Sequence, residues 1–131
     1  MTRVFKSTEL HIETKNQPGM LAQITSPLAE AGVNLHACCA YGIKKEGHFM
    51  ILTDNNAKAL EALEKAGFKA SISDVVVVET ENEVGSLNRA AADLANANVN
   101  VDYCYATTGN EGVTWIVIAT KEIEKALNAI A

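Results

Sequence analysis

The stretch NQPGMLAQITSPLAEAGVN, residues 16–34, decides the fold of this protein. Its Pro18-Gly19 pair marks a turn, and the residues after the turn place apolar side chains at the spacing of one helix face. These apolar residues are Leu21, Ile24, Leu28 and Ala31. LHIET, at residues 10–14, alternates apolar and polar side chains as a half-buried strand does, and Gly32 is a typical helix end. We therefore predict a strand, a glycine turn, a helix over residues 19–31 and a second strand from residue 33.

The same pattern occurs a second time, 66 residues further along the chain. The identical pairs at this offset are Glu13 and Glu79, Thr14 and Thr80, Asn16 and Asn82, Gly19 and Gly85, Leu21 and Leu87, Leu28 and Leu94, Ala31 and Ala97, Val33 and Val99, Asn34 and Asn100, and Cys38 and Cys104. A run of identities at one offset indicates internal duplication. We therefore expect two domains, residues 1–73 and 74–131. Domains of roughly 60–65 residues are small, so we expect the halves to pack on each other or on another chain.

The other segments complete each copy. In the first copy, strands are expected at 48–53 and 68–73, and a helix over 57–66 is capped by one of the residues Asp54, Asn55 and Asn56. In the second copy, strands are expected at 75–80, 99–106 and 114–119, a helix over 87–97, and a last helix capped by Thr120. The order β-α-β-β-α-β is the ferredoxin-like α+β fold, whose crossovers place both helices on one face of an antiparallel sheet.

Two features of these segments conflict with the simple pattern. Pro27 lies inside the helix over 19–31, where an interior proline usually kinks a helix. The second copy ends without a counterpart of the strand at 68–73. Either that strand is dispensable, or another segment, such as residues 1–7, supplies the edge of the sheet.

Composition excludes several classes of function. The chain has 131 residues, of which 48% are hydrophobic and 21% charged, with a net charge of −5, which argues against nucleic acid as the main partner. No apolar run approaches the roughly 20 residues that span a membrane, and the N-terminus lacks the apolar segment of a signal peptide. Three cysteines, two of them adjacent, do not form a disulfide framework. We therefore expect a cytoplasmic protein with no membrane partner.

The signature N-Q-P-G-M-L-A-x-I-x-x-x-L-A-E-A-G-V-N-L resembles that of ACT domains, which are small regulatory modules that sense amino acids. Two copies with EKAGF, residues 64–68, between them resemble the stand-alone tandem ACT proteins over residues 10–131. The resemblance implies two ferredoxin-like repeats side by side, with strand 33–41 against strand 99–106 in one eight-stranded antiparallel sheet and the helices on one face. It also implies an effector between the modules, held by the glycine turn of one and the strand start of the other.

Carried onto this sequence, the resemblance implies two sets of ligand-binding residues. They are Asn16, Gln17, Gly19, Met20 and Leu21 facing Asn100, and Asn82, Glu83, Gly85, Ser86 and Leu87 facing Asn34. Backbone N–H groups at the start of a helix suit an α-carboxylate, and an asparagine amide offers a donor and an acceptor to a zwitterion. Glu81 and Glu83 suit an ammonium group. Val84 replaces the proline of the first turn, so we expect the two sites to differ.

The same residues also have structural explanations that involve no ligand. Asn34 and Asn100 are equally well explained as bends after a helix, since asparagine tolerates the left-handed conformation. Gly19 and Gly85 are equally well explained as turn formers. A metal or redox site is a further alternative, built from His11, His36 and Cys38 if they share one face of the sheet, or from Cys38 and Cys104 across the seam, although no metal-ligand spacing supports it.

No histidine lies beside a recognisable nucleophile or paired carboxylates, so we expect no catalytic residue, no metal and no cofactor. We expect a non-catalytic regulatory protein of amino-acid metabolism, a homodimer that binds an amino acid at the seam and acts allosterically on a regulated enzyme partner. One alternative is a structural module that dimerises without a ligand. The other is a ferredoxin-like metal or redox sensor.

Overall fold

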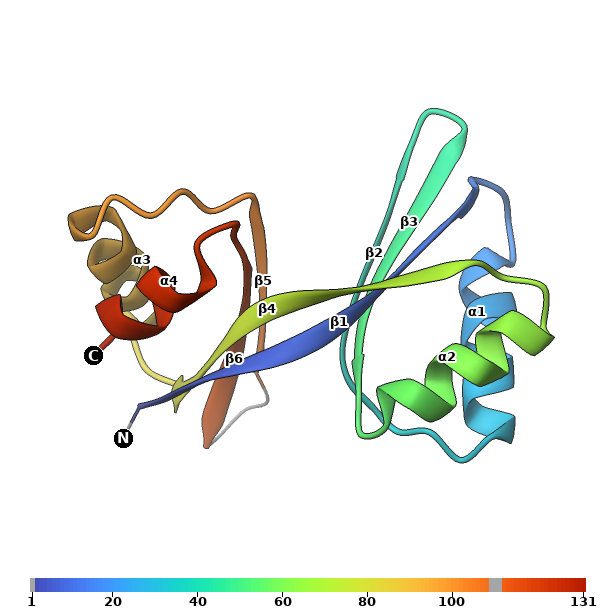
Figure 1. The fold of residues 1–131 in the computed structure, drawn as a ribbon, viewed down its shortest axis with the longest axis horizontal. Helices are drawn as coiled ribbons and strands as arrows, with labels where there is room; N and C mark the ends of the chain where they lie inside the picture. Colours follow the sequence, from blue (N-terminus) through green and yellow to red (C-terminus); the bar gives the residue numbers. More distant parts are fainter. Residues whose placement is uncertain (1, 109–111) are drawn as a thin grey trace. The chain divides into compact units, whose positions relative to one another are not determined.

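A computed structural model describes residues 2–108 and 112–131 of the chain, drawn in Figure 1. The elements are β1 (Arg3–Lys15), α1 (Met20–Glu30), β2 (Leu35–Ile43), β3 (Glu46–Thr53), α2 (Asn56–Lys65), β4 (Ala70–Glu81), α3 (Ser86–Asn96), β5 (Tyr103–Thr108), β6 (Val113–Ala119) and α4 (Ile123–Ala129). None of the helices in the described ranges is both long and apolar enough to cross a membrane.

The chain forms two compact units. Residues 8–73 form the first unit, and residues 74–131 together with the N-terminal residues up to Ser7 form the second. These units differ from the expected division at residue 73 only in the assignment of the N-terminal segment. The 13-residue strand β1 and the 12-residue strand β4 are therefore each shared between both units.

Hydrogen bonds join the strands in the order β2-β3-β1-β4-β6-β5. In the first unit, the order β2-β3-β1-β4 is that of a ferredoxin-like βαββαβ repeat. In the second unit the corresponding order is β5-β6-β4-β1, so the N-terminal end of β1 occupies the place that β4 takes in the first unit. The α+β prediction with ferredoxin-like repeats is confirmed, as is the alternative in which the N-terminal residues supply the edge.

The expected pairing of strand 33–41 with strand 99–106 in an eight-stranded sheet is wrong for a single chain. The described residues form a six-stranded sheet, and β2 and β5 are the two end strands of its hydrogen-bonded order. The physical reason is the length of β1 and β4, since each is long enough to serve both repeats. Within the described residues, β2 and β5 are therefore not hydrogen-bonded to each other.

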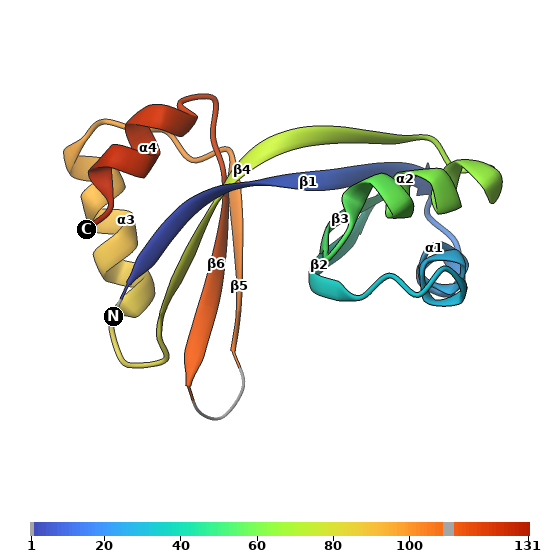
Figure 2. The ribbon, with the colours of Figure 1, turned by 60° about the horizontal axis from the view of Figure 1, so that its bottom comes forward.

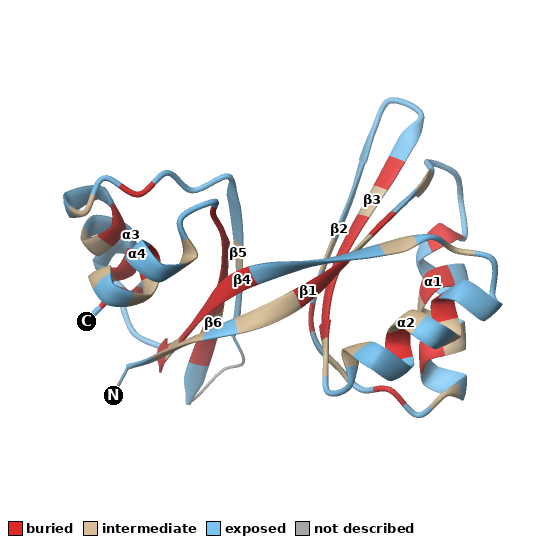
Figure 3. Ribbon diagram, viewed as in Figure 1, coloured by how far each residue is buried: buried red, intermediate tan, exposed pale blue. Residues whose placement is uncertain are grey.

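The core of the first unit lies between one face of its strands and its two helices. The buried residues are Leu10, Ile12, Met20, Ile24, Leu28, Val33, Phe49, Ile51, Ala59 and Leu63. Leu10 and Ile12 alternate with the less buried His11 and Glu13, as the sequence predicted, although Glu9 is also fully buried. Figure 3 shows the buried stripe on α1 and α2. Helix α1 continues through Pro27 to Glu30, and the Ala31 N–H donates to the Pro27 carbonyl at 3.1 Å. Asn55 caps α2 by accepting from the Lys58 N–H at 3.1 Å.

The second unit repeats this arrangement, and Figure 2 shows α3 and α4 together on one side of β5 and β6. Val75 to Val78 are at most 1% exposed, as expected for a central apolar strand. Thr120 was expected to cap the last helix, but the N-cap residue is Glu122. The Thr120 hydroxyl instead donates to the Asn100 carbonyl at 2.8 Å and accepts from the Glu122 N–H at 3.2 Å. The Thr120 side chain therefore links the end of β6 to the residues that precede β5.

A polar and aromatic cluster attaches the N-terminal end of β1 to the second unit. The Arg3 Nε donates to one oxygen of Glu79 at 3.1 Å, and the Trp115 Nε1 donates to the other at 2.9 Å. The Phe5 ring packs edge-on against Trp115 at 5.7 Å between centroids, and the Arg3 guanidinium lies 4.5 Å from the Phe5 ring centroid. The hydrogen bond from Trp115, and then that from Arg3, lowers the pKa of the Glu79 carboxyl.

Replacing Glu79 by glutamine should reduce the stability of the second unit at pH 7. Because the folded state lowers the pKa of Glu79, the carboxylate stabilises the fold above its unfolded pKa of about 4.3, and this stabilisation is lost as the pH falls through the folded pKa. Urea denaturation followed at Trp115 from pH 7 to pH 3 should therefore show a weaker pH dependence in Glu79→Gln than in the unmodified protein. Glu61→Gln, at an exposed i,i+4 pair with Lys65, is the control and should change little. An unchanged pH dependence in Glu79→Gln would contradict the assignment.

Candidate functional site

Each unit places a left-handed glycine at the start of its first helix. Gly19, before α1, has φ 89° and ψ −4°, and Gly85, before α3, has φ 90° and ψ 0°. Neither helix has a hydrogen-bonded side-chain cap among the described residues. A Cβ at position 19 would have Gln23 Nε2 as its nearest neighbour, at 4.0 Å, so the requirement for glycine is conformational. The two turns therefore present uncapped helix N-termini in the same backbone geometry.

In the first turn, most of the expected ligand-binding side chains stabilise the turn itself. The Asn16 N–H donates to the Lys45 carbonyl at 2.9 Å, and its side-chain amide donates to the Lys44 carbonyl at 3.1 Å, which ties the turn to the β2–β3 hairpin. The Gln17 amide donates to the sulfur of Met20 at 3.6 Å, and Met20 is buried. Leu21, by contrast with Met20, is an apolar side chain that is 52% exposed.

The second turn carries an ion pair that the sequence pattern did not predict. Arg89 Nη2 lies 2.7 Å from a carboxylate oxygen of Glu83 and donates to the Ser86 hydroxyl at 3.1 Å. The Ser86 hydroxyl, which is buried, donates to the Glu81 carbonyl at 2.6 Å. We expected Glu83 to be available to a ligand ammonium, but Arg89 already compensates its charge. Comparison of the repeats could have placed Arg89 beside the turn, because Arg89 is the counterpart of Gln23. The backbone N–H of each residue donates to the carbonyl of its turn glycine.

Asn34 and Asn100 are both exposed and follow the first helix of each unit. The Asn34 carbonyl accepts from the Asp54 N–H at 3.0 Å, and the Asn34 N–H donates to the Asp54 carboxylate at 3.1 Å. Neither asparagine has a positive φ, so their reading as left-handed bends is wrong. The left-handed residues are Gly32, with φ 74°, and its counterpart Asn98, with φ 58°. The facing of each turn with the asparagine of the other module stays a prediction.

The metal alternative needs a different set of residues. The register places His11 and Cys39 on either side of Met50, whereas Cys38 lies opposite the core residue Ile51, so Cys38 does not share the face of His11. The expected set of His11, His36 and Cys38 is therefore wrong, because β2 changes register between Leu35 and Ala37.

Another group of possible ligand atoms lies on the face of His11. Glu13, Glu46 and His48 offer three atoms within 4.8 Å of one another. His48 Nδ1 lies 3.3 Å from His11 Nε2, and His48 Nε2 lies 3.6 Å from Glu46. Such a nitrogen and oxygen donor set suits a divalent cation such as Zn²⁺. Both glutamates are exposed, so the grouping is also explained as surface charge.

The cysteines give little support to a redox role. Cys38, Cys39 and Cys104 are free thiols. Burial, and then the nearby Glu9 carboxylate, raises the pKa of the Cys39 thiol. Burial and the neighbouring Cys39 raise the pKa of Cys38 in the same way. The thiolate is the reactive form, so these environments disfavour redox reactivity at neutral pH.

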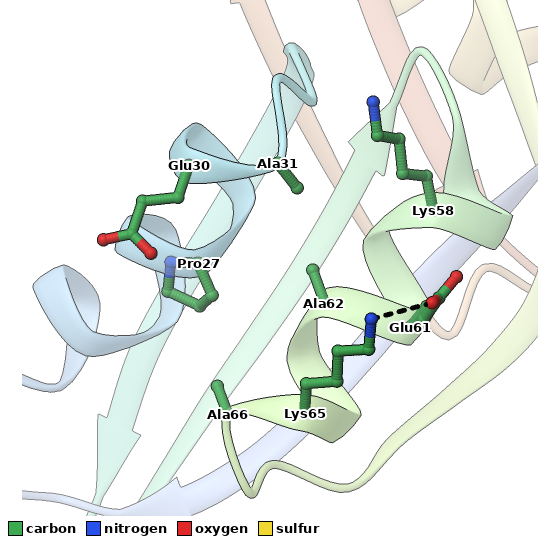
Figure 4. Close-up of a pocket in the computed structure, with 8 residues that line it drawn as sticks. All are labelled: Pro27, Glu30, Ala31, Lys58, Glu61, Ala62, Lys65 and Ala66. Atoms are coloured by element: carbon green, nitrogen blue, oxygen red, sulfur yellow. Dashed lines mark ion pairs between the residues drawn. The ribbon is translucent and has the colours of Figure 1, made fainter.

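A groove lies between α1 and α2 in the first unit, with a volume of about 450 Å³ (Figure 4). Pro27 and Ala62 line it, and charged side chains border it, among them Lys65, which pairs with Glu61 at 3.0 Å. Neither the glycine turn nor Asn34 contributes to its lining. The groove is therefore separate from the residues that the sequence predicted to bind a ligand.

Comparison with known proteins gives both a family and a set of structural relatives. A family model described as an ACT domain pair matches residues 5–131. Protein BT0572 from Bacteroides thetaiotaomicron is 27% identical, with a TM-score of 0.87 over 96% of this chain and 87% of that chain. The ligand-free regulatory subunit of aspartate kinase from Thermus thermophilus is 20% identical, with a TM-score of 0.65 over 96% and 93%.

The aspartate kinase of Clostridium acetobutylicum is 22% identical, with a TM-score of 0.59 over 97% of this chain and 33% of that chain. At these identities, the likeness to the two aspartate kinase structures shows a shared fold. The comparison with curated proteins gives no match.

The geometry of the first turn predicts the effect of two substitutions at Gly19. Gly19→Ala should lower the free energy of unfolding by about 1 kcal/mol, because an alanine side chain disfavours positive φ. Gly19→Asn should cost less, since asparagine tolerates this conformation. Urea denaturation of both variants measures the difference. Equal losses in the two variants would show that something other than backbone conformation requires glycine here.

Proposed function

Since this chain belongs to the family of ACT domain pairs, we propose that it is a non-catalytic regulatory protein that binds an amino acid at its glycine turns. ACT domains are regulatory modules. The observation that carries the proposal is the pair of helix N-termini, each entered through a left-handed glycine and neither capped by a side chain in the described structure. Backbone N–H groups and the positive end of the helix dipole at such a position attract an α-carboxylate.

The two turns should bind ligands with different affinities. Pro18 restricts the first turn, whereas the second has Val84 at this place, and Val84 is fully exposed. In the second turn, the guanidinium of Arg89 adds a positive charge that Glu83 now compensates. A ligand carboxylate there competes with Glu83 for Arg89, while its ammonium group can take the place of Arg89 beside Glu83.

We propose that the protein acts as a homodimer. The two end strands, β2 and β5, suit strand pairing between two copies of the chain. Tyr41 and Ile43, both in β2, are large apolar side chains that are 45% and 53% exposed. In such a dimer, the turn of one module can face Asn34 or Asn100 of another, which is the arrangement that the family resemblance implies.

Regulation follows if the ligand favours one packing of this seam. An effector that binds one arrangement better shifts the population toward it, and an enzyme partner responds to the change. The similar Thermus thermophilus protein is a regulatory subunit, which supports action on an enzyme of amino-acid metabolism. The three free thiols fit the reducing environment of the cytoplasm.

A thermal-shift screen of the twenty amino acids and of divalent metals tests the function. A ligand at about 100 times its Kd stabilises the protein by about 2.7 kcal/mol, so a specific amino acid should raise Tm clearly. A response to metal alone would favour the sensor built on Glu13, Glu46 and His48. No response, together with a dimer in light scattering, would favour the structural module.

Gly19→Leu should abolish the ligand-induced shift that depends on the first turn, because the side chain covers the approach to the N-terminus of α1. Gly85→Leu tests the second turn in the same way. Gly67→Leu is the matched control, since Gly67 has the same φ of 89° but follows α2, and no atom lies within 4 Å of its Cβ position. It should lose similar stability and keep the ligand response. A response that persists in both turn variants would contradict the proposed sites.

A further inference from the structure

The second unit contains an apolar pocket of about 250 Å³. Leu87, Ala90 and Ala91 of α3 line one part, Val101 and Cys104 line another, and Ile116 of β6 also contributes. The complete lining consists of leucine, alanine, valine, isoleucine and cysteine side chains. The pocket therefore offers an apolar surface with no charged or amide group.

Comparison of the two repeats explains why space exists here. Ile24 of the first repeat is fully buried, and its counterpart at the offset of 66 is Ala90, which removes all side-chain atoms beyond Cβ. Ile12 pairs with Phe49, and the counterpart of Ile12, Val78, pairs with Ile116. Ile116 therefore stands where the first repeat has the larger Phe49.

Two neighbouring positions change in the same direction. At the same offset, Thr25 corresponds to Ala91 and Leu35 corresponds to Val101. Protein interiors are normally close-packed, and an apolar void lowers stability. Four side chains around this space are shorter than their counterparts, although the first repeat accommodates the larger ones at the same places. This difference indicates that the space is kept open for a ligand.

The pocket also joins the second turn to the residues that flank Asn100. Leu87 lies in the first turn of α3, directly after the bend formed by Gly85 and Ser86. Val99 and Val101, which flank Asn100 in sequence, line the same pocket. The second turn and the neighbours of Asn100 therefore meet within one unit, whereas the family resemblance implied that Asn34 faces this turn.

We propose that this pocket takes the apolar side chain of the bound amino acid, so that the second unit selects a branched aliphatic or thioether side chain over a charged one. The inference rests on the proposed function, because it names the class of ligand for the second turn. The volume suits one side chain, being smaller than pockets that hold drug-sized molecules. A charged side chain would lose its hydration there without gaining a partner.

Filling the pocket with the side chains of the first repeat tests the proposal. Ala90→Ile and Ile116→Phe each restore a residue that the same fold accommodates in the first unit, so at least one variant should fold with undiminished Tm. Titration calorimetry with L-leucine, L-isoleucine, L-valine and L-methionine should show affinity reduced about tenfold or more in a folded variant, as expected for a filled hydrophobic pocket. Asn96→Leu, at an exposed position of the same helix that does not line this pocket, is the control and should bind normally.

The outcomes separate this inference from the proposed function. Binding of charged or polar amino acids only, unaffected by either filling variant, would leave the proposed function intact and overturn the pocket assignment. Undiminished binding of aliphatic amino acids in a folded filling variant would also overturn it. If no amino acid binds the unmodified protein, the proposed function fails, and the inference fails with it.

Discussion

The fold depends on the pairing of the N-terminal end of β1 with the second unit. The chain holds two copies of one repeat, and among the described residues no segment after α4 takes the place of the last strand beside β4. The residues before Thr8 fill that place, and Glu79 fixes them by accepting from both Arg3 and Trp115. An unfilled place would leave one side of β4 without hydrogen-bond partners beside an almost fully buried run of valines. One continuous strand therefore completes two small cores that are each near the lower size limit for stable folding.

Duplication gave the chain two glycine turns with the same backbone geometry and different side chains. The turn at Gly19 is held by Pro18 and by the bonds of Asn16 to the hairpin, so it is rigid and carries little charge. The turn at Gly85 is surrounded by Glu83 and Arg89, which compensate each other. Under the proposed function, the equal backbones and different side chains of the two turns would let them respond to different concentrations or different ligands.

Divergence extends from the turns into the cores. The first unit packs Ile24 and Phe49 at places where the second has Ala90 and Ile116. The first unit thus has larger side chains at these places, and the second has an apolar space beside α3. Because the repeats share one backbone pattern, each serves as an internal reference for the other, and changes in one copy can be tested by transferring residues from its counterpart.

The sequence by itself determined the duplication, the α+β order of elements and the glycine turn at the start of each first helix. These features are local, since side-chain periodicity and the conformational freedom of glycine act within a few residues. It did not determine the partners of residues far apart in the chain. The attachment of Arg3 to Glu79, the face on which Cys38 lies and the space left by Ala90 depend on strand order and register. Only the tertiary structure decided these, because a one-residue change of register moves a side chain to the other face of a sheet.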